Sequence, residues 1–302
     1  MKILNTRNLA FLIAAFYTAS GKLSEYRVLS RGGLNYEGLS RTHRQFAGRP
    51  RTIREQFTAA QAAGLEEICL TDHLDINYCN PAYDKIIDYE NYFKEIDALR
   101  AEFPTLSIRR GIEAGEHAGS TKETLAVVQA HDFDYVLLSQ HMVDGLDPVD
   151  YDKFIAGRTV EAAYRRYAEC VWESVNRFHD FDCLAHFGYC SKFAPHRPDL
   201  RPFDRAYAPD VVDAVLKKLA EDGKALEINT SGLKNGGTST IPGADMVKRF
   251  IELGGEFVMF GSDAHYTEYV AYEFDYARQM ALSCGAKYTL TFTRRKGTPV
   301  RI

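Results

Sequence analysis

Several features are scarce or missing in this 302-residue sequence. None of the six cysteines forms a C-x-x-C pair and most lie in apolar runs, so we predict reduced, buried thiols of a cytoplasmic protein. The net charge of −4 argues against a broad basic surface for nucleic acid. No apolar run is long enough to cross a bilayer as a helix. These absences leave a globular chain, 45% hydrophobic, with ample length for a large core.

The first 33 residues differ from the rest of the chain. The short apolar run "NLAFLIAAFYTA", residues 8–19, follows Lys2 and Arg7 and is similar to the core of a weak signal peptide. The segment "YTASG" that follows is a poor cleavage region, so a loosely packed extension or a start codon placed too far upstream are the alternatives. We therefore expect residues 1–33 to be an N-terminal extension whose role stays open, and residues 34–302 to be a single domain.

From about residue 52 the chain alternates between helical and strand patterns. Thr52 is the predicted N-cap of the first helix and Gly64 its predicted stop. Helices are predicted over residues 52–64, 89–104, 121–131, 159–178, 208–223, 243–255 and 273–285. Strands are predicted over residues 66–73, 106–117, 134–141, 183–187, 225–232, 256–265 and 288–293. This alternation predicts a parallel sheet with crossover helices, and the number of units favours a closed or nearly closed α/β barrel.

Most of the predicted strands end at a side chain that can bind a metal. These residues are Asp72, His73, Glu113, His141, His186, Asn229, Asp263 and His265. In an α/β barrel the carboxyl ends of the strands converge on one face, so we expect a shared metal site there. Imidazoles alone suit zinc, whereas added carboxylates extend the choice to manganese, iron or a cluster of ions. Glu113 could bridge two ions, an arrangement typical of phosphoester hydrolysis.

A structural role is the alternative for each of these residues taken singly. A histidine after a strand is commonly a hydrogen-bonded core or surface residue, and this is our interpretation of His43, His117, His131, His179 and His196. Asp72 and Asp263 could each cap a neighbouring segment. The metal hypothesis is favoured because the structural alternative must explain so many strand ends independently.

The sequence resembles the PHP (polymerase and histidinol phosphatase) superfamily, specifically its monofunctional histidinol-phosphatases. The matching stretches are "GLEEICLTDHLD" (64–75), "RRGIEAGEH" (109–117), "LLSQHMVDG" (137–145), "CLAHFGYCSKFAP" (183–195), "ALEINTSGLK" (225–234) and "VMFGSDAHY" (258–266). The resemblance covers residues from about 52 to 296. It implies a distorted (β/α)7 TIM-like barrel, the PHP fold, that holds two to three divalent ions, such as manganese, zinc or iron, at the carboxyl ends of its strands.

The resemblance also implies roles for individual residues. Glu113 would bridge two ions and act in catalysis together with Asp263. One ion would be held by His141 and His186, another by Asp263, and a third by His73 and His265. Lys192 and Lys234 fall in regions where members bind the substrate's phosphate, although arginine is more usual there, and a solvated surface lysine is the alternative for each. The implied reaction hydrolyses L-histidinol phosphate to L-histidinol and phosphate in histidine biosynthesis, with a water that the metal ions activate.

One departure from the family is clear. Members carry a His-x-His motif in the first strand, and this chain has none. One alignment places Glu37 and Leu39 at those positions and another places Arg41 and His43 there, so Glu37 or His43 could supply a single ligand. The alternatives to a histidinol-phosphatase are therefore a phosphoesterase for another small phosphorylated substrate and a non-catalytic member that binds a metal or ligand.

Other partners are not indicated by the sequence. We expect no nucleic-acid or membrane partner, and no oligomeric state is implied. The aromatic residues Tyr78, Phe187 and Tyr266 lie near strand ends and could line a pocket for an imidazole ring.

Overall fold

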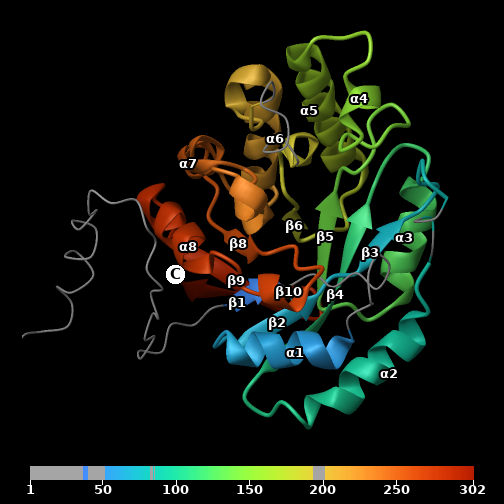
Figure 1. Cartoon of the computed structure of the whole chain (residues 1–302), viewed down its shortest axis with the longest axis vertical. Helices are drawn as coiled ribbons and strands as arrows, with labels where there is room; N and C mark the ends of the chain where they lie inside the picture. Colours follow the sequence, from blue (N-terminus) through green and yellow to red (C-terminus); the bar gives the residue numbers. More distant parts are fainter. Residues whose placement is uncertain (1–36, 40–51, 82–83, 85, 193–200) are drawn as a thin grey trace, which may run out of the picture. The chain divides into compact units, whose positions relative to one another are not determined.

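The central sheet of the computed structural model contains eight parallel strands (Figure 1). The structure describes residues 37–39, 52–81, 84, 86–192 and 201–302. The strands are β1 (Glu37–Leu39), β2 (Glu67–Leu70), β3 (His73–Asp75), β4 (Ser107–Gly115), β5 (Tyr135–Ser139), β6 (Cys183–Leu184), β7 (Ala225–Asn229) and β8 (Val258–Gly261).

The sheet closes on itself. Its strand order is β2-β1-β8-β7-β6-β5-β4-β3, and β2 also pairs with β4. Leu70 of β2 pairs with Arg110, and His73 of β3 pairs with Glu113, so β2 and β3 keep one register along β4 and act as a single interrupted strand. The ring therefore has seven strand positions, and the predicted distorted (β/α)7 barrel is confirmed.

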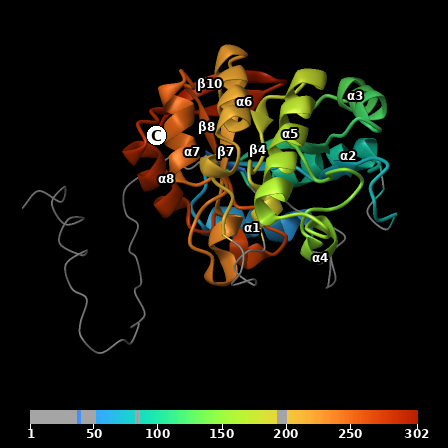
Figure 2. The same ribbon diagram turned by 90° about the horizontal axis from the view of Figure 1, so that it is seen from above.

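Helices surround this ring, as the view from above shows (Figure 2). Thr52 and Glu55 form a capping box at the start of the first helix, and Gly64 follows its end with a φ of 78°, which glycine tolerates best. Each of the seven predicted helices is present, and α4 is an additional short one. They are α1 (Ile53–Ala62), α2 (Tyr89–Arg100), α3 (Thr121–Ala130), α4 (Tyr151–Phe154), α5 (Val160–Arg177), α6 (Pro209–Glu221), α7 (Ala244–Glu252) and α8 (Phe274–Ser283).

Two apolar layers stabilise the barrel. Val136 and Leu138 of β5 belong to the large cluster that joins the sheet to the helices, whereas Tyr135 and Leu137 belong to a smaller cluster inside the ring. This split follows from the two-residue period of a strand, which sends successive side chains to opposite faces. Because both faces are covered, the strands are almost continuously apolar in sequence.

The last predicted strand does not join the barrel. β9 (Tyr288–Thr293) forms an antiparallel hairpin with β10 (Lys296–Arg301), and β10 was not predicted. Leu290 and Phe292 of this hairpin enter the inner apolar cluster. The hairpin also contacts Asp134 and Asp182, which directly precede β5 and β6, so it lies at the amino ends of these strands.

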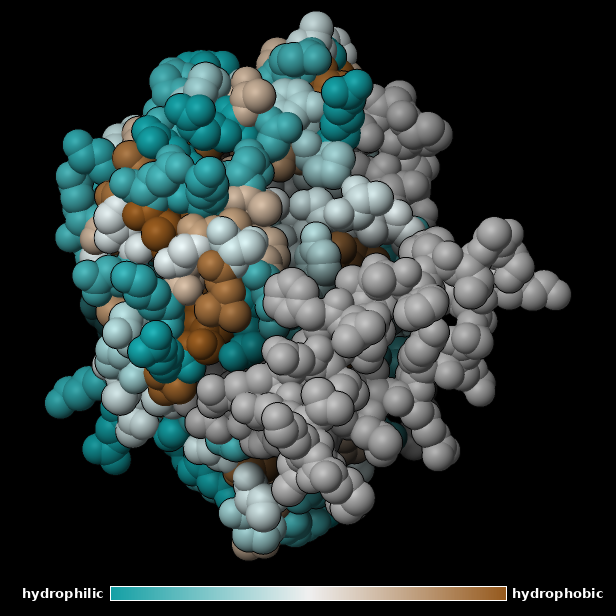
Figure 3. All heavy atoms as spheres, turned by 90° about the vertical axis from the view of Figure 1, so that its left-hand side faces the viewer, coloured by the Kyte–Doolittle hydropathy of each residue, from teal (hydrophilic) through white to brown (hydrophobic). Residues whose placement is uncertain are grey.

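One face of the molecule is mostly polar where it is described. On the face in Figure 3, hydrophilic residues predominate and hydrophobic residues form small separate groups. Among the described helices, none combines the length and hydropathy that a membrane crossing needs. The predicted extension at residues 1–33 lies outside the described residues, and its role stays a prediction.

Candidate metal centre

The carboxyl ends of neighbouring strands bring imidazoles and carboxylates together. His73 begins β3 and pairs in the sheet with Glu113 of β4. His141 and His186 each lie two residues beyond the last residue of their strands, β5 and β6. Glu113, His141 and His186 are all buried, the first and last completely. Side chains as far apart in the sequence as His73 and His186 therefore contribute to one cluster at one end of the barrel.

The first half of this cluster is built on one oxygen of Glu113. Its Oε1 lies 3.0 Å from His186 Nε2 and 3.1 Å from His141 Nε2. The two imidazole nitrogens are 3.4 Å apart. Nitrogen and carboxylate donors that converge in this way fit a divalent cation such as zinc, manganese or iron. Ser139 donates a hydrogen bond of 2.5 Å to the same Oε1 and so fixes the carboxylate.

The second half of the cluster faces the other oxygen of Glu113. Its Oε2 lies 3.5 Å from His73 Nδ1, and the His73 ring is 6.2 Å from the ring of His265. The two oxygens of Glu113 therefore face different imidazoles. This is the arrangement that a carboxylate adopts when it bridges two ions.

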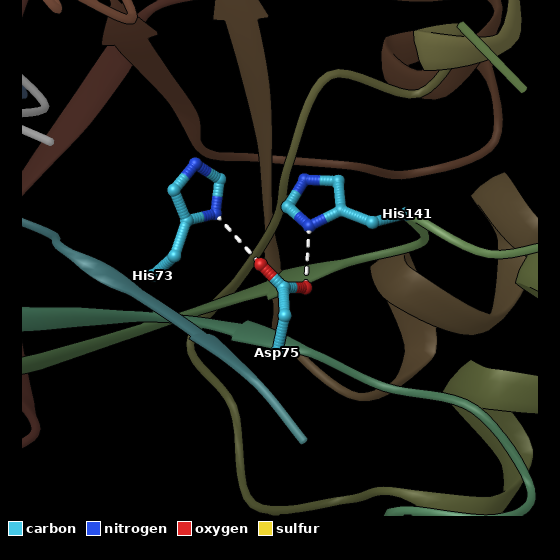
Figure 4. Close-up of side chains that lie close together, drawn as sticks. All are labelled: His73, Asp75 and His141. Atoms are coloured by element: carbon cyan, nitrogen blue, oxygen red, sulfur yellow. Dashed lines mark hydrogen bonds and ion pairs between the residues drawn. The ribbon is translucent and has the colours of Figure 1, made fainter. Parts of the chain in front are cut away.

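Asp75 is a member of the cluster that the sequence analysis missed. One of its oxygens lies 2.8 Å from His141 Nδ1 and the other 3.1 Å from His73 Nδ1, so the carboxylate lies between the two rings (Figure 4). A β-carbon at Gly115, its partner on β4, would approach Asp75 Oδ1 to 1.8 Å, so glycine makes room for this carboxylate. A carboxylate that binds the second nitrogen of a histidine fixes the ring and raises its basicity as a ligand.

Burial and charge set opposite pKa shifts in the cluster. Burial disfavours the charged form of His141, but Asp75 and Glu113 outweigh it and raise its pKa to about 10. Burial alone would raise the pKa of Asp75, yet His141 and His73 hold it well below its usual range. Burial lowers the pKa of His265 to about 3, against the charge of Asp263. A cation that binds His141 must therefore displace a proton, whereas His265 is neutral near pH 7.

Asp263 lies beside this cluster with two lysines. It follows β8 by two residues, is 1% exposed, and forms an ion pair with Lys192. Its Oδ1 is 3.3 Å from His265 Nδ1. Lys234 donates to the carbonyl oxygens of Ser262 at 2.8 Å and Asp263 at 3.0 Å. The described donors close enough to share one ion form two groups, His73–Asp75–His141 and Glu113–His141–His186, and Asp263 is in neither.

Other candidate residues serve different purposes. The hydroxyl of Tyr92 donates to Asp72 at 2.5 Å, and the Asn229 side chain accepts from the amide of Ser231 at 2.9 Å. Phe187 is completely buried among aromatic rings, so it does not line an open pocket. β1 places Glu37–Leu39 between β2 and β8, in agreement with the alignment that assigned Glu37 and Leu39 to the first strand. The side chains of these residues, and Arg41 and His43, lie outside the described residues.

Comparison with known families gives one domain match. Residues 41–231 match the family model described as the PHP domain. The sequence is 30% identical to the histidinol-phosphatase of Lactococcus lactis over 244 residues, which cover 80% of this chain and 89% of that protein. It is 34% identical to the probable histidinol-phosphatase of Deinococcus radiodurans over 253 residues, 82% of this chain and 93% of that protein.

Solved structures agree with these sequence matches. The crystal structure of the Lactococcus lactis histidinol phosphate phosphatase, in complex with zinc, L-histidinol and phosphate, superimposes with a TM-score of 0.75 at 27% identity. That match covers 86% of this chain and 98% of the other. A putative histidinol phosphatase of Listeria monocytogenes, with a TM-score of 0.68 at 20% identity, shares the fold and covers 79% and 98% of the two chains.

Proposed function

The chain belongs to the PHP domain family, among its histidinol-phosphatases, and on this premise we propose that it hydrolyses L-histidinol phosphate to L-histidinol and phosphate. The observation that carries the proposal is the position of Glu113, with one oxygen near His141 and His186 and the other near His73. Such a donor set suits a metal-dependent phosphomonoesterase.

The proposed centre takes two to three divalent ions, with manganese, zinc or iron as candidates. Glu113, His141 and His186 would hold the first ion, and Glu113, His73 and His265 the second. Asp263 would help to hold a third. When bound, the ions ionise water near neutral pH and neutralise charge that develops on the phosphoryl oxygens.

The chain's own residues would position these ligands. Asp75 binds Nδ1 of His141, which leaves Nε2 directed at Glu113. Ser139 holds the carboxylate of Glu113 from the adjacent strand. Glu113 and Asp263 are the proposed catalytic residues, because both carboxylates are buried at the end of the barrel where the substrate would react.

Lys192 and Lys234 are the proposed phosphate-binding residues. Both ammonium groups lie at Asp263, one on its carboxylate and the other on its carbonyl oxygen. An ammonium can attract phosphate as a point charge but lacks the bidentate geometry of arginine. The proposed partner is thus a small phosphorylated molecule, and the cytoplasmic location stays a prediction.

Release of phosphate from L-histidinol phosphate tests the proposal. The full-length protein would be freed of metal with a chelator, reloaded with Mn²⁺, Zn²⁺ or Fe²⁺, and compared with a blank that contains the ion alone. We expect turnover only in the reloaded protein. Turnover of other small phosphates but not of this one would favour a different substrate.

A non-catalytic member is the second candidate function. The absence of a His-x-His motif and the ion pair between Lys192 and Asp263 favour it, because both leave the third ion with fewer ligands. Bound metal without phosphate release from any of these substrates would support this candidate and contradict the first.

A further inference from the structure

Beside the metal centre, three residues from three separate segments of the chain meet through their polar groups. Tyr78 donates a hydrogen bond of 2.6 Å from its hydroxyl to Asp147 Oδ2. The hydroxyl of Tyr189 lies 3.5 Å from Asp147 Oδ1. Each of the three follows a proposed ligand closely in sequence, Tyr78 after His73, Asp147 after His141 and Tyr189 after His186. We call them the Asp147 group.

The ring of Tyr189 connects this group to the metal centre. Its centroid is 4.8 Å from that of His141 and 5.0 Å from that of His186. Because the hydroxyl lies at the far edge of the ring, the tyrosine spans the interval between the imidazoles and Asp147. All three residues of the group are half-buried rather than completely enclosed in the core.

The group carries one negative charge. Within the described part of the chain, Asp147 forms no ion pair with a lysine, arginine or histidine. Its carboxylate accepts hydrogen bonds from the two hydroxyls and from the amide of Val149, which donates to Oδ1 at 2.9 Å, and the Cys79 thiol also lies near Asp147. Burial and then the charge of Asp147 raise the pKa of Tyr78, so this hydroxyl keeps the proton that it donates to the carboxylate.

A cationic ligand suits this arrangement. A carboxylate that is oriented by neutral donors and flanked by aromatic rings binds an ammonium by charge, hydrogen bonds and ring faces. The alcohol that the proposed reaction releases, L-histidinol, carries a primary amine that is protonated near neutral pH and lies close to the ester oxygen. A substrate whose phosphate lies at the metal centre would therefore place its ammonium within the surroundings of that centre.

We propose that Asp147, held by Tyr78 and Tyr189, binds the ammonium group of the substrate and so selects amino-alcohol phosphates over phosphates that lack an amine. The proposal rests on the proposed function and adds the source of its selectivity. Asp147 contributes binding of the alcohol half, whereas the metal centre acts on the phosphate. Loss of its charge should therefore weaken turnover of phosphates that carry the amine and leave hydrolysis of phosphates that lack it intact.

Two substrates separate these roles. L-histidinol phosphate would be compared with its analogue in which hydrogen replaces the amino group, on the full-length, Mn²⁺-loaded protein. Asp147→Asn should lower kcat/KM for L-histidinol phosphate on the order of 10- to 100-fold, because a charged hydrogen bond is lost. For the analogue we expect a change of less than about threefold. Tyr189→Phe, which keeps the ring, should give a smaller loss on the first substrate only.

Asp144→Asn is the matched control. Asp144 lies in the same loop, is exposed, and bonds to Arg166 at 3.0 Å. It should leave both substrates unaffected. Equal losses on both substrates in Asp147→Asn, with a lower melting temperature, would show that Asp147 only anchors the loop and would overturn the proposal, as would unchanged selectivity.

Binding of L-histidinol, measured by calorimetry, distinguishes a failure here from a failure of the proposed function. If the wild-type protein releases no phosphate but binds L-histidinol, and Asp147→Asn weakens that binding at least about tenfold, the ammonium site stands while the catalytic proposal fails. If the wild-type protein neither hydrolyses the substrate nor binds L-histidinol, both proposals are overturned.

Discussion

The two ends of the barrel hold their buried and half-buried carboxylates in different ways. At the amino ends of the strands, Arg295 donates to Asp182 at 2.6 Å and Arg109 donates to Glu67 at 2.6 Å. At the carboxyl ends, Asp75 and Glu113 are surrounded by imidazoles instead. The same residue types therefore meet a permanent cation at one end and an exchangeable one at the other.

Because of this difference, the amino ends of the strands serve stability and the carboxyl ends serve chemistry. A guanidinium stays charged at any ordinary pH, so the Arg295–Asp182 pair ties the β9–β10 hairpin to the barrel and the Arg109–Glu67 pair joins the strands β4 and β2. An imidazole can exchange its proton for a metal ion, so the other end can change its charge while the fold persists. In α/β barrels generally, function belongs to the carboxyl ends of the strands and stability to the amino ends.

The largest effect should come from Glu113→Gln. The amide keeps the shape but cannot serve as a charged ligand of two ions. Since even residues behind the ligands typically contribute 10- to 100-fold, we expect activity to fall by more than about 100-fold. Phosphate release and metal content of the purified variant would be measured. Glu123→Gln, on the exposed side of α3, is the control, and near-normal turnover in Glu113→Gln would contradict the assignment.

The opposite end should respond to Arg295→Met with lost stability. Burial already raises the pKa of Asp182, and without the guanidinium its charge would lose its main partner, at a cost of about 3 kcal/mol in the free energy of unfolding. The cost should be greatest near neutral pH and decline in acid, as Asp182 takes up a proton and loses its charge. Denaturant unfolding measures it.

Two controls test whether the two ends of the barrel act independently. Arg301→Met, at the exposed end of the same hairpin, should leave the free energy of unfolding within about 0.5 kcal/mol of wild type. The folded fraction of Arg295→Met should keep its kcat/KM within about twofold, because the pair is far from the reacting atoms. A large loss of kcat/KM would show that the two ends are coupled.

Lys192→Met should raise KM about tenfold in the metal-loaded protein, because one charged contact to phosphate is removed. The cation at this end would thus serve the ligand, unlike Arg295, which serves the fold. Lys94→Met, on the exposed side of α2, is the control. An unchanged KM would return Lys192 to a purely structural role as the partner of Asp263.

The smallest expected effect is the pH dependence of stability and of metal binding that follows from His141. In the metal-free protein the raised pKa of His141, about 10, contributes stability that is complete below about pH 6.5 and is lost as the pH rises toward 10. A metal ion must displace that proton, so binding near pH 7 should release about one proton from His141 and tighten as the pH rises. Calorimetry in two buffers with different ionisation heats would count the proton. Metal affinity that is independent of pH would contradict the shift.

Much of this picture could be predicted from local sequence patterns. The predicted N-cap at Thr52 and the apolar period of each element indicated seven helices and the barrel, and the resemblance to PHP histidinol-phosphatases is confirmed. The ligand assignments, by contrast, remain proposals. Asp75 could have been found, because it lies two residues after His73 and therefore on the same face of the strand.

Two other features of the structure could not be predicted from local sequence patterns. β6 contains only two residues, and Ala185 lies in the inner apolar cluster, so strict alternation would have turned His186 outward. The chain leaves the regular strand there, and this departure brings the imidazole to Glu113. The hairpin β9–β10 was likewise mistaken for a barrel unit, since its alternating pattern is the same in either setting.

The order of the elements, the barrel class and the metal-capable residue types at the strand ends were determined by the sequence itself, because periodicity and caps act over a few neighbouring residues. Which of those side chains lie around one carboxylate was decided only by the tertiary structure. Asp75 reaches His141 across 66 positions and Arg295 reaches Asp182 across 113, and such contacts depend on strand register and loop course. Local patterns do not encode these distances, since closing the barrel is what brings the segments together.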